Sequence, residues 1–125
     1  MKTDAHWQKI GLRSHHGICL PLFSLRSQKS CGIGEFHDLI PLIDWCHSLG
    51  LDIIQTLPLC DSGTDPSPYY ALSSCALDPM YLSLCDLPGM SEDLSAFKSA
   101  TQTARIDYTL IKSMKLDCLR KYFAS

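Results

Sequence analysis

The feature that most limits the possible folds is an apolar run followed by a helical segment and a second apolar run. The runs cover residues 17–25 and 51–59, and both are typical of parallel strands that are buried on both faces. Pro41 suits the first turn of a helix over residues 40–49, and Gly50 suits the end of that helix. Together these segments predict a right-handed βαβ unit.

Apolar side chains recur at helical spacing in two places, and a short helix is predicted between them. The first predicted helix should bury a stripe formed by Ile40, Leu42, Ile43, Cys46 and Leu49. Near the C-terminus, Ser91 is a candidate N-cap for a short helix, and Asp107 for a longer helix that ends near Phe123. The apolar face of the long helix contains Leu110, Ile111, Met114, Cys118, Leu119 and Tyr122.

Two parallel strands are too few for a complete α/β domain, because a parallel sheet has to be covered on both faces and paired at its edges. The chain has 125 residues, of which 46% are apolar, and this is enough to form a hydrophobic core. We therefore expect an α/β fold that is incomplete as a domain.

The charge balance gives no sign of a nucleic-acid partner. The chain carries 11 basic and 13 acidic residues and a net charge of -2, whereas nucleic-acid-binding domains have a basic surplus. No apolar run approaches the roughly 18 residues of a membrane span, and the first residues lack the apolar core of a signal peptide. These features predict a cytoplasmic protein with no membrane partner.

The seven cysteines are odd in number and widely spaced. Several lie within apolar runs, where a free cysteine behaves as a small buried hydrophobe. We expect reduced core thiols, and a disulfide framework or a zinc site is the alternative for such a count. No histidine has metal-ligand spacing to a cysteine, so the sequence predicts no metal and no cofactor.

The glycine pair of G32-I-G34-E-F raises the alternative of nucleotide binding. A dinucleotide fingerprint needs a third glycine at position 37, and this chain has His37 there. The lysine of a phosphate-binding P-loop is also missing. A small nucleotide-binding α/β protein is therefore the weakest of the alternatives.

The stretch Ser67-Pro68-Tyr69-Tyr70 lies in a loop after the second predicted strand. Tyrosine rings in such a loop either contact sugar faces and hydroxyl groups or cover the edge of the core, and composition leaves both roles open. The Asp and Glu residues fall on predicted caps, helix surfaces and loops. Spacing therefore assigns no pair of catalytic carboxylates.

Several segments, in this order and spacing, resemble the N-terminal part of the 4-α-glucanotransferases, also called amylomaltases or disproportionating enzymes, of the α-amylase clan. The resemblance runs from about residue 10 to the last residue. The matching segments are GICLPLFSLRS (17–27), GIGEFHDL (32–39), IDWCHSLG (43–50), QTLPL (55–59), SPYYALSSCALDPMYLSL (67–84) and IDYTLIKSMKLDCLRKYF (106–123).

The resemblance implies a partial (β/α)8 TIM barrel, because a whole barrel takes roughly 250 residues. Residues 1–60 would supply the first two barrel strands and their helix, and residues 61–125 a loop and a helical insert. The implied reaction transfers α-1,4-glucan segments between maltooligosaccharides by retaining double displacement. The family's catalytic carboxylates come later in the chain than these segments. No catalytic residue is therefore assigned here, and we expect the isolated chain to be inactive.

The resemblance also implies a site for α-1,4-glucans that is built partly from this chain. Tyr69, with Ser67 and Pro68, matches the family segment whose tyrosine reaches the sugar next to the cleaved bond. Asp78 stands where many members have asparagine, and an aspartate keeps the acceptor but loses the amide donor. Three polar side chains of the first loop are candidates either for the sugar cleft or for structural roles: Ser24, Arg26 and Ser30.

The alternative to an enzyme segment is a non-catalytic remnant that binds glucan or another chain. Such a remnant would expose the edges of its sheet, so we expect it to self-associate or to be unstable. Release of glucose from maltotriose by the purified chain would contradict the expected inactivity.

Overall fold

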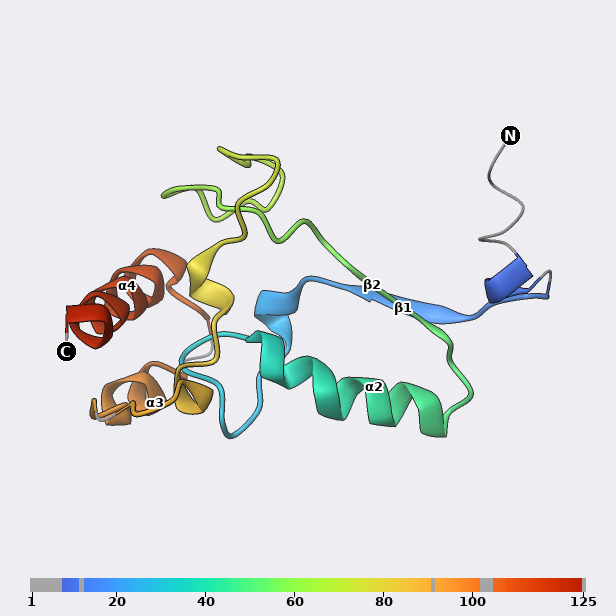
Figure 1. Ribbon diagram of the computed structural model, residues 1–125, viewed down its shortest axis with the longest axis horizontal. Coiled ribbons are helices and arrows are strands. Elements are labelled where there is room, and N and C mark those ends of the chain that lie inside the picture. The colour runs from blue at the N-terminus through green and yellow to red at the C-terminus, as the bar shows by residue number, and fades with distance from the viewer. Residues whose placement is uncertain (1–7, 12, 91, 102–104, 125) are drawn as a thin grey trace.

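The computed structural model describes residues 8–11, 13–90, 92–101 and 105–124. Two strands, β1 (Gly17–Leu20) and β2 (Ile53–Thr56), are joined through helix α2 (Leu39–Ser48). Two further helices, α3 (Ser95–Thr101) and α4 (Tyr108–Ala124), lie at the opposite end of the elongated molecule from the first described residues (Figure 1). Short 3-10 turns connect these elements: η1 (Leu22–Ser24), η2 (Phe36–Asp38), η3 (Pro79–Tyr81) and η4 (Leu84–Asp86).

The predicted βαβ unit is confirmed. The two strands pair in parallel, with Gly17 opposite Ile53 and Leu20 opposite Thr56. The first strand is shorter than predicted, because Pro21 has no N–H to donate to a neighbouring strand. The chain turns there instead, and the backbone N–H and hydroxyl of Ser24 both donate to the Pro21 carbonyl, at 3.1 and 2.8 Å.

Helix α2 begins and ends close to the predicted positions. Pro41 lies in its first turn, where a missing N–H costs nothing. Gly50 has a positive φ of 75° just beyond the last turn. The N–H of Gly50 donates to the His47 carbonyl at 3.0 Å, and the N–H of Leu51 to the Cys46 carbonyl at 2.9 Å. These two bonds form a Schellman motif, which satisfies carbonyls that the helix leaves unpaired.

The prediction that both strands are buried on both faces is wrong. Each strand alternates exposed and half-buried residues. The predicted stripe of α2 is also wrong for three of its members, because Ile40, Ile43 and Leu49 are each more than half exposed, whereas Cys46 is buried. Among the described residues the sheet has only these two strands. It therefore offers α2 too little surface to cover, as an incomplete α/β domain would.

The hydrophobic core lies instead where the loops after β1 and β2 meet α4. One buried cluster contains Leu22, Ile33, Met80, Tyr81 and Ile111. A second, next to α3, contains Cys31, Leu84, Phe97, Cys118 and Leu119. The core is thus built from segments distant in sequence rather than from the sheet.

Helix α4 follows the prediction closely at both ends. The carboxylate of Asp107 accepts a hydrogen bond from the Leu110 N–H at 3.0 Å, which is the expected cap. On the predicted apolar face, Ile111, Cys118 and Leu119 are buried, whereas Leu110 is half exposed.

The shorter helix departs from the prediction. The predicted cap Ser91 lies outside the described residues, and α3 begins at Ser95. There the Asp93 carboxylate accepts from the Ser95 N–H at 2.8 Å and from its hydroxyl, and these bonds hold the pKa of Asp93 below its usual value. In the part of the chain that the structure describes, no helix combines the length and apolar character needed to cross a membrane.

Candidate functional site

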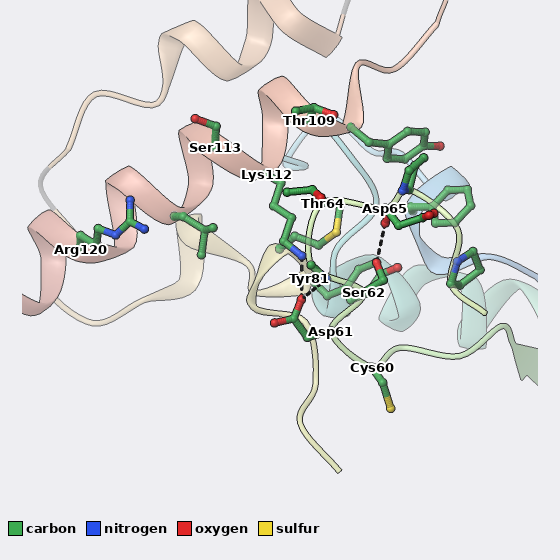
Figure 2. A pocket seen from close by; sticks show the side chains of 17 residues that line it. Cys60, Asp61, Ser62, Thr64, Asp65, Tyr81, Thr109, Lys112, Ser113 and Arg120 are labelled. Atoms are coloured by element: carbon green, nitrogen blue, oxygen red, sulfur yellow. Dashed lines mark hydrogen bonds and ion pairs between the residues drawn. The ribbon is translucent and has the colours of Figure 1, made fainter. Parts of the chain in front are cut away.

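A pocket of about 420 Å3 opens between the loop after β2 and the outer face of α4 (Figure 2). The loop contributes residues 60–66 and Pro68, and the polar side chains from α4 are Thr109, Lys112, Ser113 and Arg120. Apolar and aromatic side chains complete the lining: Phe23, Met80, Tyr81, Tyr108 and Leu116. Such a mixture of rings and hydrogen-bonding groups is typical of a small-molecule site.

Lys112 is the central charge of this pocket. Its ammonium lies 2.8 Å from Oδ1 of Asp61 and 2.6 Å from Oδ2 of Asp78. Figure 2 shows the lysine reaching from α4 toward the loop that carries Asp61. The two carboxylates come from different strands of the isolated bridge between Cys60 and Leu77, since each follows one of those residues. Lys112 therefore fastens both sides of that bridge to α4.

Local backbone geometry fixes both carboxylates. Oδ1 of Asp78 accepts from the Met80 N–H at 3.0 Å, so this side chain caps η3, and Pro79 starts the turn. Oδ1 of Asp61 accepts from the Gly63 N–H at 2.9 Å. An Asp that bonds to the N–H two residues later is a common way to close a tight turn. The ion pairs thus use side chains that the turns have already oriented.

Lys112 and Asp61 stabilise each other's charged forms. The hydrogen bond from Lys112, together with that from Gly63, lowers the pKa of Asp61. Burial acts against the charge of Lys112, but the hydrogen bonds to Asp61 and Asp78 outweigh it and raise the lysine pKa. Burial, with the nearby Asp78, also raises the pKa of Tyr81 to about 12. Asp61 is therefore suited to accept hydrogen bonds and not to donate a proton in catalysis.

A family model described as 4-alpha-glucanotransferase matches residues 20–125. The chain belongs to the 4-alpha-glucanotransferase family. The 4-alpha-glucanotransferase of Chlamydia caviae is 46% identical over 123 residues, which cover 94% of this chain and 23% of that protein. That of Chlamydia pneumoniae is 46% identical over 127 residues, with 96% and 24% covered. 4-alpha-glucanotransferase DPE2 of Oryza sativa subsp. japonica is 37% identical over 117 residues, with 86% and 12% covered. The chain therefore spans about a quarter of the length of the chlamydial relatives.

The residues carried over from the glucanotransferase resemblance do not all meet at the pocket. Pro68 lines it, and Asp78 lies buried behind Lys112. Ser67 shapes the loop, because its N–H donates to Asp65 Oδ1 at 2.7 Å and its hydroxyl accepts from the Tyr69 N–H at 3.4 Å. Tyr69 is 70% exposed and is not part of the pocket lining.

Of the three polar candidates near the first loop, Ser24 and Ser30 bond within the fold and Arg26 is exposed. Ser30 is buried, and its hydroxyl donates to Asp38 Oδ2 at 2.8 Å. The same oxygen of Asp38 accepts from the Glu35 N–H at 2.7 Å. Ser24 bonds to its own turn, as described above, and Arg26 is exposed. Ser24 and Ser30 therefore have the structural roles that the sequence left open.

The glycine loop is not arranged to bind phosphate. The N–H of Gly34 already donates to the Phe23 carbonyl at 3.1 Å. A Cβ atom on Gly34 would lie 1.9 Å from the Leu22 carbonyl oxygen, and one on Gly32 2.5 Å from the side chain of Ile111. These glycines permit close packing of backbone against backbone and helix, which is a structural use.

The ion pairs of Lys112 and Lys115, two lysines of α4, were not predicted from the sequence. Lys115 is fully buried and pairs with Glu35. The sequence did indicate the burial of Lys115, because position 115 falls on the same helical face as Ile111, Cys118 and Leu119.

Within the described ranges, no group of three or more His, Cys, Asp or Glu side chains could hold a metal ion.

Proposed function

We propose that this chain forms the N-terminal segment of a 4-α-glucanotransferase barrel. Residues 1–60 would contribute the first two strands and their helix, and residues 61–125 the loop and helical insert. The observation that carries the proposal is the family match over residues 20–125, at about a quarter of the relatives' length. The parallel βαβ unit with open edges supports it, since barrel strands are parallel and paired on both sides.

The proposed reaction of the complete enzyme transfers α-1,4-glucan segments between maltooligosaccharides by retaining double displacement. Such a reaction needs two carboxyl groups, one as nucleophile and one as acid and then base. Asp61 and Asp78 are both engaged by Lys112 and are unsuited to these roles. The catalytic carboxylates are therefore expected in the remaining part of the family's length, and the proposed location of the protein is the cytoplasm.

The direct test is incubation of the purified chain with maltotriose. We expect no glucose release and no longer oligosaccharides. Fusion of the chain to the remaining three quarters of a chlamydial relative should restore transfer, because the fused protein would contain both parts of the proposed barrel. Glucose release by the chain alone would contradict the assignment of catalysis to the other segment. Failure of a folded fusion would contradict the proposed position of this chain in the enzyme.

We further propose that the loop after β2 contributes to glucan binding through Tyr69, with Ser67, Pro68 and Asp78 supporting it. An exposed tyrosine ring is available to contact a sugar face. Replacement Tyr69→Ala in the fused protein should weaken maltoheptaose binding about fivefold, since such a contact contributes about 1 kcal/mol. Tyr70→Ala is the matched control, because Tyr70 is adjacent and is also 70% exposed. Equal effects of the two substitutions would remove the specific role of Tyr69.

A second candidate function is that of a non-catalytic chain which associates with a second copy of itself. The apolar side chains exposed on α2 favour it: Ile40, Ile43, Trp45 and Leu49. Sedimentation of the isolated chain over a range of concentrations tests this candidate. Association that Ile43→Glu abolishes would support it, and a monomer at all concentrations would contradict it.

A further inference from the structure

Two thiols that are 54 residues apart in sequence converge at one point of the structure. The Sγ atom of Cys31, in the loop after β1, lies 3.8 Å from the Sγ atom of Cys85, in η4. Both face the same backbone oxygen, that of Lys29. Cys85 Sγ is 3.4 Å from it and Cys31 Sγ is 4.0 Å from it. The thiols therefore share one site instead of lying in separate parts of the core.

The backbone around these thiols is held in place by contacts that do not involve sulfur. The His37 N–H donates to Ser83 Oγ at 3.0 Å, and the His37 ring lies 2.6 Å from the Asp86 carboxylate. The Lys115 ammonium donates to the Leu82 carbonyl at 2.9 Å. These bonds bracket Cys85 on both sides. Formation of a disulfide shortens the sulfur–sulfur distance from 3.8 Å to about 2.05 Å.

The two thiols differ in access to solvent, and this difference assigns their order of reaction. Cys85 is exposed, whereas Cys31 is buried. Burial raises the pKa of Cys31, so this thiol is protonated when a reagent arrives. A soluble oxidant can meet only Cys85 first. Cys31 is positioned to attack the mixed disulfide from inside, at the distance given above.

We propose that Cys31 and Cys85 form a reversible modification site, in which a small-molecule disulfide such as oxidised glutathione converts the two thiols into an intramolecular disulfide. In the first step Cys85 loses a proton to solvent, and its thiolate attacks the glutathione disulfide and releases one glutathione thiolate. In the second step the Cys31 sulfur attacks Sγ of Cys85 and displaces the second glutathione as a thiolate, which takes up the proton that Cys31 loses. Both cysteines are oxidised, and one glutathione disulfide is reduced to two thiols.

The link would tie the loop of residues 26–35 covalently to η4. It would close a long loop of the unfolded chain, and such closure stabilises the folded state. It would also restrict the exposed residues Arg26 and Lys29, which are the trypsin sites of this loop. Linked protein should therefore melt at a temperature higher by about 5–10 °C and should be cut more slowly between residues 26 and 30.

The test uses the full 125-residue chain, treated with excess oxidised glutathione and then blocked with an alkylating reagent. Peptide mass spectrometry should find Cys31 joined to Cys85, with a loss of two hydrogen atoms and no retained glutathione, and a thiol reductant should reverse the link. Cys75→Ser is the control, because Cys75 is also exposed, and it should leave the link intact. Cys85→Ser should abolish both the link and the rise in melting temperature.

Cys31→Ser adds a second measurement, since it should trap glutathione on Cys85. If substitution of the buried Cys31 unfolds the chain, the comparison of Cys85→Ser with Cys75→Ser still tests whether the link requires Cys85. A folded wild-type chain that keeps glutathione on Cys85 while Cys31 stays free would overturn the proposal. A link from Cys85 to any other cysteine would overturn it as well.

Discussion

The ammonium of Lys115 on α4 is paired with the carboxylate of Glu35, which lies 80 residues earlier in the sequence. The two side chains are 0% and 2% exposed. Lys115 also donates to the Leu82 carbonyl between η3 and η4. One lysine therefore joins the loop that contains Gly32 and Gly34, the segment between η3 and η4, and α4, all of which contribute to the core.

Removal of one partner of this ion pair should be severe. Lys115→Met leaves a buried carboxylate unpaired, and Glu35→Gln leaves a buried ammonium unpaired, so each should cost about 3–5 kcal/mol of unfolding free energy. The double variant should cost less than the sum, because neither charge is then left alone. Urea titration of the four proteins measures this coupling.

The exposed pair between Arg120 and Asp117 provides the control for that experiment. Their side chains are 73% and 61% exposed at a distance of 2.7 Å. Asp117→Asn should change stability by less than about 1 kcal/mol. Additive effects of the two core substitutions would show that Lys115 and Glu35 do not stabilise the chain as a pair.

Gly34 should tolerate no side chain. A Cβ atom there would lie 1.9 Å from the Leu22 carbonyl oxygen and 2.3 Å from that of Leu25. Backbone atoms cannot move aside as a flexible side chain would, so Gly34→Ala should cost at least about 2 kcal/mol. Gly89→Ala is the comparison, since Gly89 has a positive φ of 71° and a Cβ atom added to it would meet no atom within 4 Å. Thermal unfolding should rank Gly34→Ala as the more damaging, and the reverse order would refute the packing argument.

The features that the sequence predicted well are those decided by a few neighbouring residues. Pro41, Gly50 and Asp107 mark helix ends because each acts on backbone groups within one turn. Burial of side chains was predicted poorly, because it depends on which segments distant in sequence pack against an element. Ile43 is exposed where no described segment covers α2, and Lys115 is buried where the glycine loop supplies a carboxylate.

The candidate site shows the same division. The loop with Ser67 and Pro68 was located from its composition, and Pro68 does line the pocket. The partnership of Asp78 with Lys112 joins positions 34 residues apart, and no local pattern reveals it. The resemblance expects asparagine at position 78. The facing ammonium of Lys112 explains why an aspartate is suited to this position.

Substitution Asp78→Asn should therefore be mild and Asp78→Ala severe. Asparagine keeps an oxygen that can accept from the Met80 N–H, while alanine removes both the cap and the partner of Lys112. We expect the free energy of unfolding to fall by about 1 kcal/mol for Asp78→Asn and by at least about 2 kcal/mol for Asp78→Ala. Lys112 retains Asp61 in both variants. Equal losses in urea titration would contradict this prediction, because they would mean that the oxygen kept by asparagine does not stabilise the fold.

A second charge cluster lies at the start of the two strands. The Asp52 carboxylate lies 2.6 Å from Nδ1 of His15 and 3.0 Å from the guanidinium of Arg13, and it accepts from the His16 N–H at 3.0 Å. The hydrogen bond to Asp52 raises the pKa of His15. The hydrogen bonds from His15 and His16 lower the pKa of Asp52. The cluster thus connects the segment before β1 to the start of β2 through groups that titrate on both sides of pH 5.

This cluster should give the chain a stability that is greatest at mildly acidic pH. The raised pKa of His15 gives stabilisation that is complete below the unfolded value of about 6.5 and is lost as the pH rises through the folded value. The lowered pKa of Asp52 gives stabilisation that is present above about 3.9 and is lost as the pH falls through the folded value. The difference in unfolding free energy between wild type and Asp52→Asn should therefore be largest between about pH 4 and 6.5. His47→Gln, which removes an exposed histidine at the end of α2, is the comparison for the loss of a single imidazole. A difference that grows from pH 6 to pH 8 would contradict the assigned direction for His15.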